Sequence, residues 1–148
     1  MTIGELIGPD QVVVGLRAGD KAQLLQELAN RAAAATMLDA ATIFNALLAR
    51  ENLGSTGLGK GFALPHARLQ GLKAPYALFV RLARPIDFAA IDQRPVDTVI
   101  LLLTEANSGN QHLAILAAVS RPMRDGAFVQ RLRYAADPAA VHAVLASA

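Results

Sequence analysis

The chain has 148 residues, of which 53% are hydrophobic, with a formal net charge of +2 and no cysteine. This length predicts one domain over residues 1–148. The lack of cysteine excludes a disulfide framework and a thiolate metal site, and no apolar run approaches the roughly 18–20 residues that span a bilayer. The first residues also lack the basic start and apolar block of a signal peptide, so we expect a cytoplasmic protein without membrane insertion.

The first half of the chain predicts one strand followed by two helices. Residues 11–16 form a short segment with several β-branched side chains, which favours a strand. Asp20 is the expected N-cap of a helix that runs to about residue 35, and Asp39 is the expected N-cap of a second helix that ends near Arg50. Apolar residues recur at helical spacing in both segments, which indicates one buried face on each.

The second half predicts three strands and then three helices. The strands span residues 61–64, 76–82 and 96–103, and the helices follow near residues 112–121, 127–134 and 138–146. Residues 96–103 are almost continuously apolar, which indicates a central strand covered on both faces. Pro85 should end the second of these strands, and Pro122 should kink or end the first of these helices near Arg121.

The order of these elements, β-α-α-β-β-β-α-α-α, indicates the fold class. It lacks the regular alternation of strand and helix that builds a parallel doubly wound sheet. We therefore expect an α+β fold, in which helices are layered on a mixed sheet.

The basic residues are spread along the chain, and their densest group is Arg121, Arg124, Arg131 and Arg133. Solvated helix faces account for this group best, and a docking face for an acidic partner is the alternative. No aromatic residues interleave with these charges, so nucleic-acid binding is not expected.

A glycine-rich segment is the most distinctive part of the sequence. Glycines 54, 57, 59 and 61 fall within eight residues, with Ser55 and Thr56 among them. Glycine gathers where the backbone turns sharply or approaches a ligand. Exposed backbone N–H groups and hydroxyls in such a loop can bind an anion, although Ser55 and Thr56 could equally bond to the loop's own backbone. Three cations flank the segment: Arg50, Lys60 and Arg68.

The chain has three histidines, which differ in their promise for chemistry. His66 follows the glycines and Pro65, which fixes the direction in which the chain leaves a strand. A partly neutral imidazole can attack phosphorus without a separate base, and cations and N–H groups can neutralise the phosphoryl oxygens without a metal or cofactor. His112 gains interest only if it pairs with His66, and His142, on the last helix, is interpreted as structural. The segment therefore suggests phosphate chemistry on an imidazole.

The stretch from Arg50 to His66 reads Arg-Glu-x-Leu-Gly-Ser-Thr-Gly-x-Gly-x-Gly-x-Ala-x-Pro-His. It resembles the signature of the fructose/mannitol/nitrogen-type enzyme IIA domains of the bacterial phosphotransferase system. The similarity extends over nearly the whole chain, through residues 84–88, 91–97 and 112–117. Residues 119–125 and 131–133 are more similar to the stand-alone nitrogen-related branch than to sugar-permease domains.

This resemblance implies a three-layer sandwich of helices, mixed β-sheet and helices. It implies that His66 accepts a phosphoryl group on Nε2 from an HPr-like carrier, that His112 contacts and orients the phosphate, and that Arg50 pairs with it. The implied phosphate-binding residues beside them are Ser55, Thr56, Gly57 and Arg68. The implied role is regulatory: the phosphorylation state would act on targets such as potassium transporters or sensor kinases in nitrogen, carbon or potassium homeostasis.

Two positions depart from the family pattern. Pro122 replaces an apolar helix residue, and Met37 stands where the family commonly turns on glycine. The first bears on the continuity of one helix, and the second on the connection between two helices.

Three other functions remain open at this point. A sugar-permease subunit would pass the phosphate to a separate enzyme IIB. A metal-dependent hydrolase would combine His66 and His112 with Asp87 or Asp92, although the histidines lack helical His-x-x-x-His spacing. A binding module would never accept phosphate.

Overall fold

The most apolar strand is the centre of the sheet, as its composition predicts. The computed structural model describes residues 1–148, and in it β6 (Val96–Glu105) pairs antiparallel with β5 (Tyr76–Ile86) and parallel with β3 (Phe62–Ala63) and β4 (His66–Leu69). β1 (Val12–Leu16) continues the sheet beyond β5 in parallel, and β2 (Gly57–Gly59) adds to β3 in the antiparallel sense. The sheet is therefore mixed.

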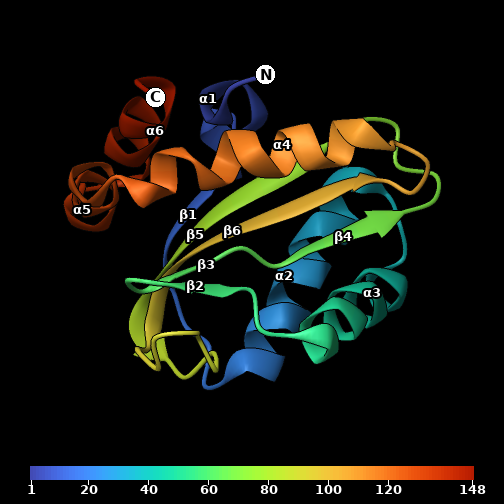
Figure 1. The fold of residues 1–148 in the computed structure, drawn as a ribbon, viewed down its shortest axis with the longest axis horizontal. Coiled ribbons are helices and arrows are strands. Elements are labelled where there is room, and N and C mark those ends of the chain that lie inside the picture. The colour runs from blue at the N-terminus through green and yellow to red at the C-terminus, as the bar shows by residue number, and fades with distance from the viewer.

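Helices cover both faces of this sheet (Figure 1). Helices α2 (Lys21–Thr36) and α3 (Ala40–Leu53) lie on one face. The other face carries α1 (Ile3–Leu6), α4 (Asn110–Ser120), α5 (Gly126–Tyr134) and α6 (Pro138–Ala146). Two short 3₁₀ helices are η1 (Pro9–Gln11) and η2 (Pro122–Arg124). The α+β class and the three-layer arrangement are both confirmed.

Alternate residues of β6 belong to two separate cores. Leu101 and Leu103 pack in the core beneath α2 and α3, whereas Ile100 and Leu102 pack in the core beneath the other helices. Successive side chains of a strand point to opposite faces, so a strand buried on both faces has to be apolar at nearly every position. This explains the continuous apolar run in the sequence.

Aspartates begin the helices as the sequence predicts. The side chain of Asp20 accepts a hydrogen bond from the Gln23 N–H, and that of Asp39 accepts one from the Thr42 N–H. Each bond satisfies a backbone donor that has no partner within the helix. Helix α3 ends at Leu53 rather than near Arg50, so Arg50 lies inside its last turn.

The prediction that Pro85 ends a strand is wrong. β5 continues to Ile86, which pairs with Val96. The pairing of β5 with β6 shifts register between Arg81 and Ile86. Proline has no N–H to donate, and an irregular stretch of a ladder tolerates it. The sequence pattern did not indicate α1, η1, β2, β4 or η2, so the observed order has more elements than the expected β-α-α-β-β-β-α-α-α.

Met37 and Pro122 each end a helix. Met37 follows α2 in the left-handed conformation, with φ of 64° and 87% of its surface exposed, and its N–H donates to the Ala33 carbonyl. It takes the conformation that glycine usually supplies at this place. Helix α4 ends at Ser120, just before Pro122 starts η2, as the sequence predicts. None of the helices has the length and apolar character that a bilayer crossing requires.

Candidate functional site

His66 is the first residue of β4. β3 and β4 both pair in parallel with β6, and Leu64 and Pro65 lie between these two strands. The Nδ1 atom of His66 lies 2.8 Å from the Leu64 carbonyl oxygen. A carbonyl can only accept, so Nδ1 carries the hydrogen and donates it. The Nε2 atom of His66 therefore keeps its lone pair and is the nucleophilic nitrogen of the ring.

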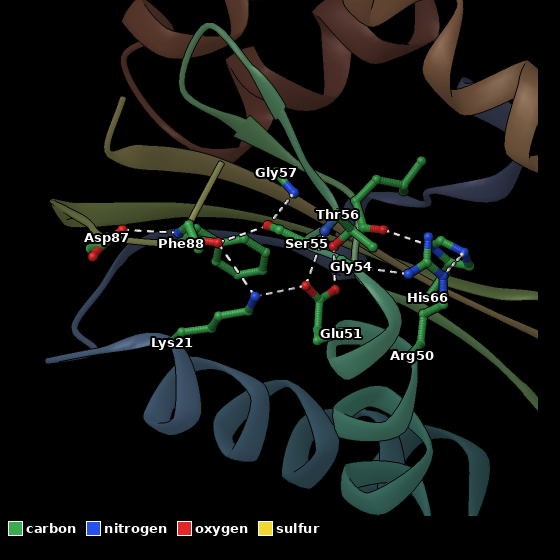
Figure 2. A network of polar contacts seen from close by, with 12 residues as sticks. Lys21, Arg50, Glu51, Gly54, Ser55, Thr56, Gly57, His66, Asp87 and Phe88 are labelled. Carbon is green, nitrogen blue, oxygen red and sulfur yellow. Dashed lines mark hydrogen bonds and ion pairs between the residues drawn. The ribbon is translucent and has the colours of Figure 1, made fainter. Parts of the chain in front are cut away.

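Arg50 reaches this nitrogen from the last turn of α3 (Figure 2). Its Nε donates to His66 Nε2 at 3.2 Å, and its Nη1 donates to the Gly54 carbonyl at 2.9 Å. Gly54 follows α3 with φ of 156° and ψ of 143°, which turns the chain away from the helix axis. The bond to Gly54 fixes the orientation of the guanidinium beside the imidazole.

His112 reaches the same place from the first turn of α4. Its ring centroid lies 5.8 Å from that of His66, and its Nδ1 lies 2.5 Å from the hydroxyl of Thr104 on β6. His112 is 6% exposed and Thr104 is fully buried. The two histidines therefore lie beside each other, which is the condition under which His112 is a candidate for the site.

Arg68 completes a ring of basic groups. His66 and Arg68 alternate along β4 with Ala67 and Leu69, which point into the core beneath α2 and α3. The two therefore share the opposite face of the strand. A hollow of about 460 Å³ is lined by Ala46, Ala49, Arg50, Leu53, His66, Ala67, Arg68 and His112.

Both imidazoles are held in the neutral form. Burial lowers the pKa of His66 below 6.5, and the nearby charge of Arg50 lowers it further, against the bond to Leu64, which raises it. Burial, followed by the charges of Arg68 and His66, lowers the pKa of His112 to about 4. A histidine that is neutral at physiological pH can act as a nucleophile or as an uncharged hydrogen-bond donor.

The loop residues Ser55, Thr56 and Gly57 are engaged inside the protein. The Ser55 hydroxyl donates to the Phe88 carbonyl at 2.8 Å and accepts from the Gly57 N–H at 3.1 Å. Thr56 is 2% exposed, and its hydroxyl and N–H both donate to the carboxylate of Glu51. These contacts match the interpretation in which the hydroxyls bond to the loop itself. They leave Arg50, His66, Arg68 and His112 as the groups that face the hollow.

Sequence reasoning missed the buried carboxylate that holds this loop. Glu51 accepts from Thr56 and forms an ion pair with Lys21 Nζ at 2.9 Å (Figure 2). The Lys21 ammonium also donates to the Phe88 carbonyl at 3.3 Å and lies 4.4 Å from the centroid of the Phe88 ring. Arg50 and Glu51 are neighbours, yet one points to His66 and the other to the loop interior. The adjacent Arg-Glu pair is visible in the sequence, but nothing in the sequence indicates its partner on α2.

The two aspartates of the hydrolase alternative lie away from the histidines. Asp87 accepts from the Ala89 N–H, and Asp92 accepts from the N–H groups of Lys60 and Arg94. The structure contains no group of three or more His, Asp or Glu side chains arranged to hold a metal ion. Neither aspartate lines the hollow beside His66.

Known proteins resemble this chain along its whole length. The family model described as phosphoenolpyruvate-dependent sugar phosphotransferase system, EIIA 2, matches residues 5–148. A nitrogen regulatory protein of Bradyrhizobium diazoefficiens is 42% identical over 99% of this chain and 95% of its own length. One from Pseudomonas aeruginosa is 35% identical, over 95% of this chain and 92% of its own.

Solved structures give the same picture. The crystal structure of nitrogen regulatory protein IIA-Ntr from Neisseria meningitidis matches with a TM-score of 0.91 and 33% identity, over 97% of this chain and 98% of that chain. IIA mannitol from Escherichia coli matches with a TM-score of 0.79 and 18% identity, over 94% of this chain and 98% of that chain, and so shares the fold.

Replacing Arg68 with glutamine should raise the pKa of His112 from about 4 toward 6.5, because one of the positive charges that oppose protonation is removed. Burial remains, so the pKa should stay below 6.5. NMR titration of the ring protons of His112 measures the change, with Arg131→Gln on α5 as the matched control. An unchanged titration in Arg68→Gln would contradict the arrangement.

The same pKa has a consequence for stability. The unfolded chain takes up this proton near pH 6.5, whereas the folded chain does so only near pH 4. Between these values the unfolded state binds more protons, so His112 makes the folded state less stable as the pH falls.

Replacing Lys21 with methionine should lower the free energy of unfolding by about 3 kcal/mol, because it leaves the buried Glu51 carboxylate without its counter-charge. Adding Glu51→Gln should recover part of this loss, since the double variant no longer buries a charge. Urea unfolding at neutral pH measures both. Arg31→Met, which breaks the exposed pair of Arg31 with Glu27, is the control and should cost roughly 0.5 kcal/mol or less. An equal loss of unfolding free energy in Lys21→Met and Arg31→Met would show that the buried ion pair stabilises the fold no more than the exposed one.

Proposed function

Because this chain belongs to the EIIA 2 family of the phosphoenolpyruvate-dependent sugar phosphotransferase system, we propose that it is a phosphohistidine carrier of the nitrogen-type branch that accepts a phosphoryl group on His66. The single observation that carries the assignment of the acceptor is the Nε2 atom of His66. This atom carries no hydrogen, its lone pair accepts only from Arg50, and it lies at a hollow that Arg50, Arg68 and His112 also line.

The nucleophile needs no base in this mechanism. The Nδ1–H of His66 stays bonded to the Leu64 carbonyl, and Nε2 attacks the phosphorus of a donor phosphohistidine. A bond forms between His66 Nε2 and phosphorus while the bond between phosphorus and the donor nitrogen breaks. The electron pair of the broken bond remains on the donor imidazole, and no proton has to leave His66. The fixed direction of the ring supplies the in-line approach that phosphoryl transfer requires.

Arg50 has to change its partner during the transfer. In the present state its Nε donates to the same lone pair that attacks phosphorus. As the new bond forms, the guanidinium gives up Nε2 and donates to the phosphoryl oxygens, while its bond to the Gly54 carbonyl limits how far it moves. Planar guanidinium groups suit this task because they offer several fixed N–H donors to an oxyanion. Arg50 thus covers the nucleophile before transfer and stabilises the phosphoryl group afterwards.

An EIIA domain works with phosphotransfer partners, and an HPr-like phosphocarrier is the donor that we propose for this chain. Phosphorylation adds a charge of about −2 to a hollow that otherwise presents two arginines and two neutral imidazoles. A regulatory partner can distinguish the two states by this charge. Curated relatives carry the name nitrogen regulatory protein, and by this similarity we propose that the partners belong to nitrogen, carbon or potassium homeostasis, as potassium transporters or sensor kinases do. The cytoplasm is the proposed place of action.

Phosphorylation by a labelled HPr-like donor tests the acceptor. Wild type and His142→Ala should take up label equally, because His142 lies on α6 and does not line the hollow. His66→Ala should take up none. His112→Ala should retain an acceptor but react about 100-fold more slowly, since it loses one donor to the transferred group. Labelling of His66→Ala would exclude His66, and an unlabelled wild type would favour a binding module that never accepts phosphate.

A sugar-permease subunit is the second candidate, because a fructose-specific EIIA component of Haloferax volcanii is 37% identical over 69% of this chain. The two roles predict different outcomes on deletion of the gene. The regulatory role predicts unchanged fructose and mannitol uptake, whereas a specific loss of either uptake would favour transfer to an enzyme IIB. Complementation with wild type and with His66→Ala controls for effects of the deletion itself.

A further inference from the structure

The hydroxyl of Thr104 is a buried group for which the transfer chemistry described above has no role. It lies 2.5 Å from His112 Nδ1, and Thr104 has no exposed surface. No other side-chain hydrogen bond of the structure involves this hydroxyl. The contact therefore joins a fully buried hydroxyl to a ring nitrogen of a side chain that is only 6% exposed.

Two arrangements of hydrogen are compatible with this contact. In one, His112 carries its hydrogen on Nδ1 and donates it to the Thr104 oxygen. The hydroxyl hydrogen would then be a buried donor without an acceptor, which is costly. In the other, the hydroxyl donates to Nδ1, so both atoms of the contact are satisfied, and the Nε2–H is left free for another acceptor. The second arrangement requires that the ring hydrogen of His112 be on Nε2.

The two histidines of the site are consequently held in opposite tautomers. His66 has its hydrogen on Nδ1, bound to the Leu64 carbonyl, and a lone pair on Nε2. His112 has a lone pair on Nδ1, bound to Thr104, and an N–H at Nε2. One ring thus offers a nucleophile and the other offers a donor, although the residue type is the same.

We propose that Thr104 is a positioning residue that fixes the tautomer of His112, so that an uncharged Nε2–H is available to a phosphoryl oxygen on His66. This inference rests on the proposed function for the transfer step, but the tautomer itself does not. Without the hydroxyl, His112 would exchange between its two tautomers, and in one of them it would present a lone pair to a negatively charged oxygen. That fraction of the molecules would oppose the transfer.

Nitrogen-15 NMR of the imidazole rings near neutral pH tests the first part, because protonated and unprotonated ring nitrogens resonate in separate ranges. In the full-length wild type we expect an unprotonated Nδ1 on His112 and an unprotonated Nε2 on His66. Thr104→Val keeps the shape of the side chain and removes the hydroxyl, so it should shift His112 toward a mixture of tautomers. Thr104→Ser keeps the hydroxyl and should retain the wild-type pattern. A protonated His112 Nδ1 in wild type, or an unchanged pattern in Thr104→Val, would overturn the proposal.

The rate of phosphorylation by a labelled HPr-like donor tests the second part. Thr104→Val should react about tenfold more slowly than wild type, a factor that corresponds to one hydrogen bond of ordinary strength, and Thr104→Ser should react at close to the wild-type rate. A rate loss in both variants would indicate a packing effect and would overturn the role in transfer, as would a tautomer change in Thr104→Val without a rate loss. A wild type with the expected tautomers that accepts no phosphate would refute the proposed function and leave the tautomer assignment standing. Amide spectra of each variant confirm that it is folded.

Discussion

The geometry of the candidate site depends on a carboxylate that lies outside it. Glu51 is buried in the last turn of α3, where it binds Thr56 and the ammonium of Lys21. A buried charge is tolerated only when it is paired and hydrogen-bonded, so these contacts hold the end of α3 and the following loop in one arrangement. Arg50 is the preceding residue, and its position beside His66 follows from that arrangement. The hydroxyl-rich part of the loop is thus a support, and the polar side chains that line the hollow carry guanidinium and imidazole groups.

The rest of the site is assembled from segments that are distant in sequence. α3 supplies Arg50, β4 supplies His66 and Arg68, and α4 supplies His112. Each of these elements packs on β6 or on its neighbours, so the central strand sets the distance between the two imidazoles. The two faces of the sheet also make different contributions. His112 comes from the layer that contains α4, whereas Arg50 reaches the site from the layer that contains α2 and α3 (Figure 1).

Local patterns in the sequence predicted much of this fold. They did not predict contacts between residues that are far apart in the sequence. Asp20 and Asp39 were identifiable as caps because capping is decided within four residues. The continuation of β5 past Pro85 was not, because it depends on the pairing of Ile86 with Val96. At the site, the spacing from Arg50 to His66 was informative on its own. The role of Glu51 depends on Lys21, and the role proposed for Thr104 depends on His112. A glutamate in a helix or a threonine in an apolar strand does not by itself indicate such a partner.

The division of β6 between two cores has a chemical consequence. Thr104 is an even-numbered position, on the face of Ile100 and Leu102, while Leu101 and Leu103 occupy the other core. A slip of one residue would exchange the two sets and turn the threonine hydroxyl toward α2 and α3. The imidazole of His112 on α4 would then lose its hydrogen bond to Thr104. The apolar packing that fixes the register of β6 therefore also determines, in the proposed arrangement, which ring nitrogen of His112 carries the hydrogen.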